Sequence, residues 1–347
     1  MKAVVLVGGF GTRLRPLTLN TPKQMLPILN RPMIEHVLEH LADNGITDAV
    51  LSMGFRPDAF RDAYPDGTCA GVEVHYAVEP EPLDTAGAIR FAALDAGIDE
   101  RFVVVNGDVL TDLDLGALVA FHDAHGGEGT IALHRVEDPS AFGVVPTDAD
   151  GRVQAFVEKP LREEAPTDLI NAGTYVLEPA VLARIDDGRK VSIEREVFPA
   201  MVADGALYAM AGDTYWIDTG TPAKYLEAQM DLLKGLRGER RDGIHPGAKV
   251  SPEATVLRSV VGEGAVVEAG ATVRGSVLMA GAHVEGGATV ERAILGPGAH
   301  VAADARVDDV AVLGQGAVVG AGLRMSGGTL GIDEHLEVEV EVDEEGS

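Results

Sequence analysis

The chain has 347 residues, 46% of them hydrophobic, which is enough for more than one ordinary core and predicts two domains. Its formal net charge of −27 argues against nucleic-acid partners, which need a basic surface. Cys69 is the sole cysteine, so we expect no intrachain disulfide and a reducing, cytoplasmic compartment. There is no run of about 18 apolar residues to cross a bilayer and no signal-peptide pattern, so we expect no membrane association.

Residues 1–235 alternate between strand and helix patterns. Strands are expected at 2–7, 48–53, 72–78 and 102–106, and helices at 33–44, 86–95 and 115–125. Strand-like runs at 130–136, 153–158, 171–177 and 207–211 extend the sheet, and 222–234 is expected to be a closing helix. This alternation predicts a Rossmann-like, three-layer α/β domain with its site at the carboxyl ends of the strands.

After a polar linker at 236–243, the pattern changes. Aliphatic residues follow one another at steps of six, six and five, so equivalent positions such as Val261, Leu278 and Leu295 lie 17 apart, and one six-residue step replaces a five before Leu313. Gly-Ala pairs recur with the same period. Such hexapeptide repetition is typical of a left-handed parallel β-helix, which we expect over 244–331. An acidic tail at 332–347 either adds an edge strand or stays solvated.

The first strand runs into a glycine-rich turn. The first 34 residues include five basic side chains and no carboxylate, which in so acidic a chain marks a place where an anion is tolerated. The turn at 8–11 lets backbone N–H groups approach phosphate oxygens, and Arg13 can pair with the β- and γ-phosphates of a nucleoside triphosphate. Pro16 follows too soon for a Rossmann loop, and no Walker Gly-Lys-Ser/Thr is present. A plain strand–turn with exposed basic residues is the structural alternative.

An ordered set of motifs is similar to the sugar-1-phosphate nucleotidyltransferases, and most like the bacterial two-domain mannose-1-phosphate guanylyltransferases. The motifs are Gly-Gly-x-Gly-Thr-Arg-Leu-x-Pro-Leu-Thr at 8–18, Pro-Lys-x-Met-Leu-Pro at 22–27, Glu-Pro-Leu-Asp-Thr-Ala-Gly at 81–87, Asn-Gly-Asp at 106–108, Phe-Gly at 142–143, Val-Glu-Lys-Pro at 157–160, Asn-Ala-Gly at 171–173 and Trp-Ile-Asp-Thr-Gly at 216–220. With the β-helix, the resemblance covers nearly the whole chain.

The resemblance implies that a sugar 1-phosphate oxygen attacks the α-phosphorus of a nucleoside triphosphate and releases pyrophosphate. A phosphate monoester has a second pKa near 6, so the nucleophile is already anionic at neutral pH and needs no general base. The site must instead hold two polyanions in line and neutralise charge, which suits Mg²⁺ on one or two carboxylates. The resemblance assigns the metal to Asp108 and Asp218; a turn former and a helix cap, respectively, are the structural alternatives.

The resemblance also assigns the other site residues. Lys23, between two prolines, would neutralise phosphate charge and, with Arg13, Asp108 and Asp218, complete the catalytic set. The nucleotide would contact Leu6, Gly8, Gly9, Gly11, Thr12, Arg13, Glu81 and Gly87. The sugar phosphate would contact Gly143, Glu158, Lys159, Asn171 and Gly173.

The base is expected to be guanine. A carboxylate at Glu81, or alternatively Glu79, can accept both N–H groups on one edge of guanine, whereas Glu81 as a solvated loop charge is the structural alternative. We therefore expect GTP and mannose 1-phosphate, with a thymidylyl- or uridylyltransferase of glucose 1-phosphate as the alternative. Two departures from the family pattern are Gln24, where proline is usual, and Asp84, where glycine is usual and a positive φ would cost strain.

Two other classes of function remain open from sequence. Hexapeptide solenoids often host acyltransferases, and His245, His283 and His300 are present, but the repeat runs unbroken without a substrate loop. A catalytically silent regulatory subunit would keep the fold, although the intact set of charged site residues argues against it. The β-helix exposes ladder edges at its ends, so we expect a homo-oligomer.

Overall fold

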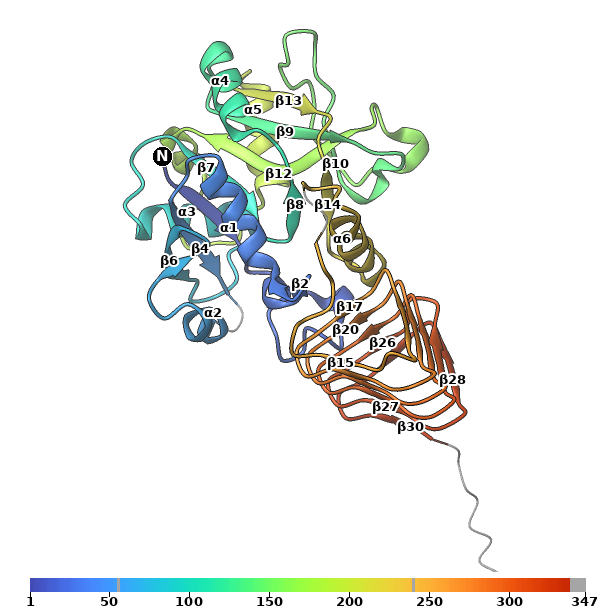
Figure 1. Ribbon diagram of the computed structural model, residues 1–347. Helices are drawn as coiled ribbons and strands as arrows, with labels where there is room; N and C mark the ends of the chain where they lie inside the picture. The colour runs from blue at the N-terminus through green and yellow to red at the C-terminus, as the bar shows by residue number, and fades with distance from the viewer. Residues whose placement is uncertain (55–56, 239–240, 338–347) are drawn as a thin grey trace, which may run out of the picture. The chain divides into compact units, whose positions relative to one another are not determined.

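The computed structural model describes residues 1–54, 57–238 and 241–337, and the chain divides into two compact units (Figure 1). The first consists of Met1–Phe10, Pro22–Met25 and Met33–Asp218; the second consists of Gly11–Thr21, Leu26–Pro32 and the chain from Thr219 onward. The second compact unit thus includes two short N-terminal segments and one helix that lie before residue 235, and the predicted domain boundary at that residue stays a prediction.

The first unit is built on a mixed sheet in the order β11-β10-β12-β7-β1-β4-β6-β5, with β9 between β12 and β13. The strands are β1 (Ala3–Leu6), β4 (Asp48–Met53), β5 (Thr68–Cys69), β6 (Val72–Val78), β7 (Phe102–Asn106), β9 (Gly129–Arg135), β10 (Gly143–Val144), β11 (Val157–Glu158), β12 (Leu169–Leu177) and β13 (Leu207–Gly212). Strands β7, β1, β4 and β6 are mutually parallel, as the near-continuous apolar runs predict. The strand expected over 153–158 is wrong in its first part: only Val157–Glu158 is a strand, and Val153 makes an isolated bridge to Thr147.

The α-helices in the described part of this unit are α1 (Met33–Asp43), α2 (Pro57–Ala63), α3 (Asp84–Asp95), α4 (Leu115–His125) and α5 (Phe198–Ala203). The helices expected at 33–44, 86–95 and 115–125 are confirmed within two residues, whereas α2 and α5, of seven and six residues, were not predicted. Val4 and Val104 of the sheet share one buried core with Ile89 of α3. Alternate strand residues face the opposite side, so the sheet buries both of its faces in a three-layer α/β domain.

The second unit contains a parallel β-helix made of three sheets, whose stacked coils are the orange and red part of the ribbon (Figure 1). Its strands are β15 (Lys249–Val250), β16 (Thr255–Leu257), β17 (Val260–Val261), β18 (Val266–Val267), β19 (Thr272–Arg274), β20 (Val277–Leu278), β21 (His283–Val284), β22 (Thr289–Glu291), β23 (Ile294–Leu295), β24 (His300–Val301), β25 (Arg306–Asp308), β26 (Val312–Leu313), β27 (Val318–Val319), β28 (Arg324–Ser326), β29 (Thr329–Leu330) and β30 (His335–Leu336). The architecture fits the left-handed β-helix that the repeat predicts.

The register of the coils confirms the predicted period. Val261 pairs with Leu278, 17 positions on, and Leu295 pairs with Leu313, where the longer step falls. The Gly-Ala pairs turn the corners: Gly281 has a φ of 69°, and Ala282 beside it is completely buried. Strand β30 lies beyond the expected end at 331, so the start of the acidic tail continues the coil, while residues 338–347 lie outside the described part.

Helix α6 (Pro222–Lys234) has the predicted bounds and belongs to the second unit. The Thr221 hydroxyl accepts a hydrogen bond from the Lys224 N–H at its start, and Gly235 in the left-handed region ends it. Gln229 bonds the hairpin of β2 (Pro27–Ile28) and β3 (Arg31–Pro32), accepting from the Leu29 N–H at 2.8 Å. Among the described residues, no helix combines the length and apolar character that crossing a membrane requires.

Candidate active site

Two aspartates meet through a pair of very short strands in the first unit. After β7, the turn at 106–108 leads into β8 (Val109–Thr111), which pairs antiparallel with β14 (Trp216–Asp218) so that Val109 lies opposite Asp218. Asp108 directly precedes this ladder. The predicted metal ligands Asp108 and Asp218, far apart in sequence, are therefore brought together at the end of β7.

Lys23 lies against both carboxylates. Its ammonium nitrogen Nζ hydrogen-bonds Asp108 Oδ2 and lies 3.6 Å from Asp218 Oδ1. The lysine side chain is only 6% exposed, whereas the two carboxylates are 29% and 26% exposed. Like charges this close repel each other, so the ammonium compensates a carboxylate pair that would otherwise be costly to assemble.

The same carboxylate pair fits a divalent cation. Hard ions such as Mg²⁺ take oxygen ligands, usually one or two carboxylates completed by substrate oxygens and water. Asp108 and Asp218 already converge on one cationic group and remain partly open to solvent. The donor set is therefore suited to a divalent metal.

Gly107 allows the turn to approach β1 closely. Its N–H donates to the Leu6 carbonyl oxygen at 2.9 Å, and a Cβ built on it would lie 2.7 Å from Val7 Cγ1 and 3.3 Å from Gln24 Cγ. A larger residue would push Asp108 away from the strand. Gln24, one of the two departures, is 3% exposed and packs beneath this turn, so it fills the space under the site.

A β-bulge in β12 borders the same turn. The register between β12 and β9 shifts between Asn171 and Tyr175, and Gly173 within the bulge has a φ of 73°. A Cβ on Gly173 would lie 2.5 Å from Asn106 Nδ2, so only glycine lets the bulge approach the end of β7. Sequence motifs indicated both segments, but not that Gly173 packs on Asn106.

Asn171 holds this bulge in place. Its Oδ1 accepts from the Gly173 N–H at 3.0 Å, and its Nδ2 donates to the Tyr175 hydroxyl at 2.9 Å. Burial raises the pKa of Tyr175, so that hydroxyl keeps its proton at neutral pH. Both polar ends of Asn171 thus make hydrogen bonds within the chain, and the sugar contact expected for it stays a prediction.

Trp216 was not predicted as a site residue, although it belongs to a motif. Its indole N–H donates to the Ala172 carbonyl oxygen at 2.9 Å and so ties β14 to the bulge. The His134 ring stacks on it with 5.2 Å between ring centroids, and burial lowers the pKa of His134. The stacked rings of His134 and Trp216 therefore form an uncharged aromatic surface at the strand that carries Asp218.

Three of the residues predicted to contact the sugar phosphate, Gly143, Glu158 and Lys159, come together on the β10–β11 pair. Gly143 lies opposite Glu158 in the register, and a Cβ on it would lie 2.6 Å from the Phe156 ring. Lys159 has a φ of 48°, and its Nζ is 2.9 Å from Glu158 Oε1 with the side chain 58% exposed. This gives an open ammonium–carboxylate pair at the edge strand β11, which β10 separates from the bulged strand β12.

In the glycine turn, Gly9 has open space where a Cβ would be, and Gly8 faces Glu79. The carboxylate of Glu79 accepts from the Leu83 N–H at 2.9 Å and from the Ser52 hydroxyl at 3.3 Å, whereas Glu81 is exposed. The acid that borders the turn is therefore Glu79, and base recognition by Glu81 stays a prediction.

Three predicted nucleotide residues, Gly11, Thr12 and Arg13, belong to the second unit. Gly11 has a φ of 59° and precedes the short 3₁₀ helix η1 (Thr12–Leu14), where its carbonyl oxygen accepts from the Thr18 hydroxyl at 2.8 Å. Arg13 is exposed. The turn is thus preorganised by its own hydrogen bonds, and the part that these residues take in nucleotide binding stays a prediction.

Two positions of the 81–87 motif have a structural explanation. Asp84 has a φ of 63°, which confirms that this position needs the left-handed conformation for which glycine is better suited. Gly87 would place a Cβ 2.7 Å from Leu83 Cβ, and its N–H donates to the Val191 carbonyl oxygen at 3.2 Å. Helix packing therefore requires a glycine here, and the contact of Gly87 with the purine stays a prediction.

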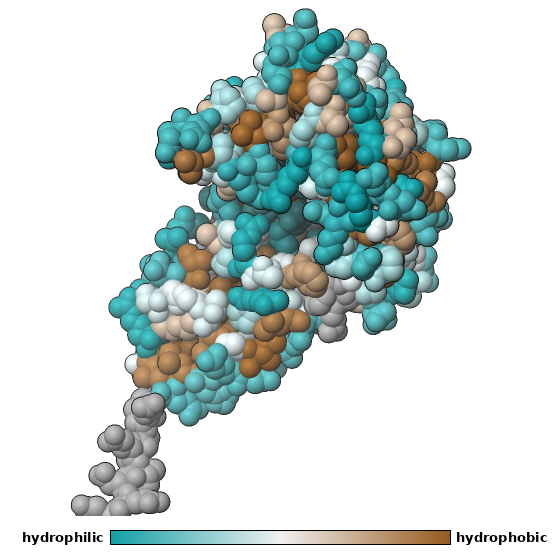
Figure 2. Space-filling model, turned by 180° about the vertical axis from the view of Figure 1, so that it is seen from behind, coloured by the Kyte–Doolittle hydropathy of each residue, from teal (hydrophilic) through white to brown (hydrophobic). Residues whose placement is uncertain are grey.

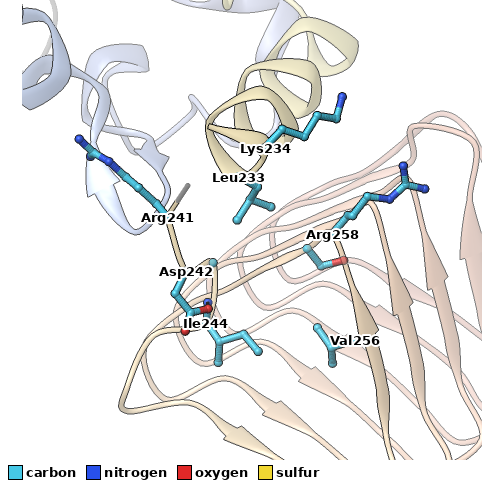
Figure 3. Close-up of a pocket in the computed structure, with 9 residues that line it drawn as sticks. Leu233, Lys234, Arg241, Asp242, Ile244, Val256 and Arg258 are labelled. Carbon is cyan, nitrogen blue, oxygen red and sulfur yellow. The ribbon is translucent and has the colours of Figure 1, made fainter. Parts of the chain in front are cut away.

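A pocket of about 610 Å³ in the second unit lies between the end of α6 and the first coils of the β-helix. Figure 3 shows the aliphatic side chains of Leu233, Ile244 and Val256 around it, with Lys234 and Arg258 extending away from its middle. The residues that line it include none of the predicted site residues, so the chemistry is not placed there.

Comparisons with known proteins identify both parts of the chain. The family model for nucleotidyl transferase matches residues 2–235, and the GMPPB C-terminal domain model matches residues 241–345. A mannose-1-phosphate guanylyltransferase of Mycobacterium tuberculosis is 46% identical over 268 residues, 75% of this chain and 74% of that protein. A mannose-1-phosphate guanyltransferase of Schizosaccharomyces pombe is 42% identical, covering 74% and 73%. The crystal structure of HddC from Yersinia pseudotuberculosis complexed with GMP-PN matches with a TM-score of 0.58 and 29% identity, covering 67% of this chain and 99% of that one.

Proposed function

This chain belongs to the nucleotidyl transferase family and is a nucleotidyltransferase, and on that premise we propose that it converts GTP and mannose 1-phosphate into GDP-mannose and pyrophosphate. The name shared by relatives that are 46% and 42% identical supports this pair of substrates. These relatives do not favour the alternative, a thymidylyl- or uridylyltransferase of glucose 1-phosphate. The observation that carries the proposal is the convergence of Lys23, Asp108 and Asp218 at the end of β7.

In the proposed reaction, the phosphate monoester is already anionic and attacks the α-phosphorus in line with the leaving pyrophosphate. Mg²⁺ held by Asp108 and Asp218 would supply positive charge to the phosphate oxygens. Lys23 orients the two carboxylates and adds its own charge beside them. The arrangement acts by positioning and electrostatic stabilisation, which preorganised charges provide without reorganising during the reaction.

The sugar phosphate is proposed to bind at the β10–β11 pair. Lys159, largely exposed, would pair with the phosphate, and Glu158 beside it would accept hydrogen bonds from sugar hydroxyls. Gly143 is buried against the Phe156 ring and Glu158, and any contact that it makes to the sugar would come from its backbone. Asn171 and Gly173 would act from the bulge, Asn171 chiefly by shaping it.

The triphosphate is proposed to bind the glycine turn. Gly9, just after Leu6 and Gly8, has open space where a Cβ would be, so no side chain there obstructs an anion, whereas Gly8 faces the carboxylate of Glu79. Gly11, Thr12 and Arg13 would complete the turn. Glu81 would accept from the guanine edge, which makes it the residue to test for base choice.

We also propose a cytoplasmic homo-oligomer joined through the β-helix. Supporting features are the large apolar side chains exposed in the second unit, namely Leu236, Ile244 and Leu257. Figure 2 shows hydrophobic areas beside hydrophilic ones on the face of the β-helix turned toward the viewer. Sedimentation at the mass of a single chain would contradict the oligomer. Acyl transfer is not proposed, because the described coils follow one another without an inserted substrate loop.

A substrate panel tests the proposal. The purified protein is incubated with each of GTP, dTTP, UTP and ATP against mannose 1-phosphate and glucose 1-phosphate, and pyrophosphate release is measured with and without Mg²⁺. We expect turnover with GTP, mannose 1-phosphate and Mg²⁺ together, and its loss on chelation. Use of dTTP without GTP would contradict the guanylyl assignment while leaving the reaction class intact. Turnover that persists after chelation would contradict the metal role of the aspartates.

A further inference from the structure

Two histidines stack on one face of the β-helix. His283 of β21 pairs in register with His300 of β24, and their neighbours Val284 and Val301 are completely buried. Because side chains alternate along a strand, both imidazoles face outward from the same column of positions. Their ring centroids lie 4.9 Å apart with 7° between the ring planes. The rigid ladder of the coils therefore holds two imidazoles side by side.

Two glutamates on the same coils are fixed beside these rings. Glu268 accepts from the Gly286 N–H at 3.1 Å, and Glu285 accepts from the Ala303 N–H at 2.7 Å. The other oxygen of each carboxylate lies 2.8 Å from an imidazole Nε2, Glu268 with His283 and Glu285 with His300. The hydrogen bond from the backbone N–H fixes the orientation of each carboxylate, so that its second oxygen points toward an imidazole ring.

Three potential ligand atoms of this group lie together. One ring nitrogen each from His283 and His300 and one oxygen of Glu285 are all within 4.8 Å of one another, and all three side chains are partly exposed. We propose that His283, Glu285 and His300 form a binding site for a divalent transition metal of the Zn²⁺ class, separate in composition from the aspartate site. A solvent molecule would complete a tetrahedral set, as in zinc sites with two histidines and a glutamate.

The donor chemistry selects the class of ion. Imidazole suits Zn²⁺, Co²⁺ and Ni²⁺, whereas Mg²⁺ prefers oxygen ligands alone. Two zinc–nitrogen bonds of about 2.0–2.1 Å place their nitrogens at most about 4.2 Å apart. The ligand atoms here lie within 4.8 Å of one another, which is close to that separation. Each ligating nitrogen must present its lone pair, so the proton it shares with a glutamate moves to the other ring nitrogen or to solvent.

The chain contains a matched control in the same column of the β-helix. His335 of β30 also has a carboxylate neighbour, with its Nδ1 3.1 Å from Glu337 Oε1. Its register partner on the preceding coil is Val318 rather than a histidine. His335 thus offers one imidazole and one carboxylate on the same scaffold, without the second imidazole that the proposed site needs.

The test is calorimetric titration of the full-length protein with ZnCl₂ in the presence of excess MgCl₂, repeated with CoCl₂ to record visible absorption. We expect one Zn²⁺ per chain at this site and cobalt absorption typical of tetrahedral coordination. His300→Gln should weaken binding at least about tenfold and remove the cobalt bands, because one of three ligands is lost. His335→Gln should bind as the wild type does. Turnover of the Mg²⁺-loaded enzyme should not change in either variant.

A second variant covers the case in which His300→Gln fails to fold. Glu285→Gln keeps an oxygen for the Ala303 N–H but loses the charged ligand, and it should also weaken Zn²⁺ binding. Zn²⁺ should raise the unfolding temperature of the wild type and of His335→Gln, because it binds the folded state only. Equal zinc affinity in the wild type, His300→Gln and Glu285→Gln would overturn the proposal. So would the absence of binding to the wild type.

Discussion

The edge of the first unit that carries the candidate site, with Lys23, Asp108 and Asp218, and the β-helix of the second unit are stabilised in opposite ways. At the edge, Lys23 reaches Asp108 across 85 positions of sequence, and each contact there occurs once. In the β-helix the same pairing repeats at 17 or 18 positions, as from Val261 to Leu278 and from Leu295 to Leu313. The edge therefore concentrates function in individual residues, whereas the β-helix distributes stability over equivalent ones.

The use of glycine shows the same contrast. In the β-helix, the corner glycines Gly264, Gly281 and Gly298 have φ values of 67°, 69° and 65°, so one conformation is repeated coil after coil. At the edge, Gly107 and Gly173 are needed for two different close approaches, to Val7 and to Asn106. The corner glycines can be recognised in the sequence because they recur at a fixed period. The need for Gly107 and Gly173 depends on the residue that each one packs against, which the sequence does not show.

The largest expected effect is on catalysis at the edge. Asp108→Asn removes one charge of the carboxylate pair, and we expect kcat to fall by roughly 10²–10³-fold, as when a preorganised electrostatic group is lost. The unfolding temperature should change little, because Asp108 is partly exposed. Pyrophosphate release and thermal unfolding measure the two quantities. Asp95→Asn, an exposed carboxylate at the end of α3, is the control and should retain activity. Unchanged turnover in Asp108→Asn would indicate that Asp108 only helps to form the turn and takes no part in catalysis.

The next effect concerns stability in the β-helix. Leu295 is completely buried between Leu278 and Leu313, so Leu295→Ala should lower the free energy of unfolding by about 3 kcal/mol. Urea denaturation followed by circular dichroism measures it. Leu257→Ala removes a leucine that is 50% exposed and should cost less than about 0.5 kcal/mol. If the two variants were equally stable, the coils would not share a common core.

Gly173→Ala tests whether the bulge is shaped by its contact with Asn106. The new Cβ would combine a left-handed backbone with a 2.5 Å approach to Asn106 Nδ2, so we expect a loss of about 2 kcal/mol together with reduced turnover. Gly45→Ala is the matched control, since its φ is 77° but nothing lies within 4 Å of the added carbon. It should lose about 1 kcal/mol and keep its activity. Similar behaviour of the two variants would show that backbone strain alone matters.

The smallest expected effect is on the free energy of unfolding, and it depends on pH through an ion pair of the first unit. Arg184, at the end of the 3₁₀ helix η5 (Pro179–Arg184), donates to both oxygens of Glu128 at 2.6 and 2.8 Å and lowers the pKa of that carboxyl group. A lowered pKa means that the stabilisation is present above the unfolded pKa, near 4.3, and is lost as the pH falls through the folded pKa.

Glu128→Gln should therefore be less stable than the wild type by about 1 kcal/mol at pH 7, with the difference shrinking toward zero in acid. Urea denaturation at pH 7 and at pH 3 measures this. Glu163→Gln, an exposed residue of the 3₁₀ helix η4 (Arg162–Glu164), should match the wild type at both values. A difference between Glu128→Gln and the wild type that grows in acid would contradict the assigned direction of the pKa shift.

The local sequence determined much of the fold. The strands at 48–53, 72–78 and 102–106 and helix α6 have the predicted bounds, because apolar runs and capping residues act within a few positions. The β-helix followed from its repeat, since each coil contacts only its neighbours. The strand pair β8–β14 was missed, because three-residue strands carry too little periodicity to be detected.

The residues of the candidate site could be proposed from motifs, but their arrangement could not. Antiparallel pairing of β8 with β14 decided that Asp108 and Asp218 face one lysine, and the packing of Gly173 on Asn106 decided where the bulge lies. Such contacts join segments far apart in sequence, and their energies depend on partners that no local pattern specifies. Sequence alone therefore determined which elements and which chemical groups are present, whereas the tertiary structure decided which of those groups meet.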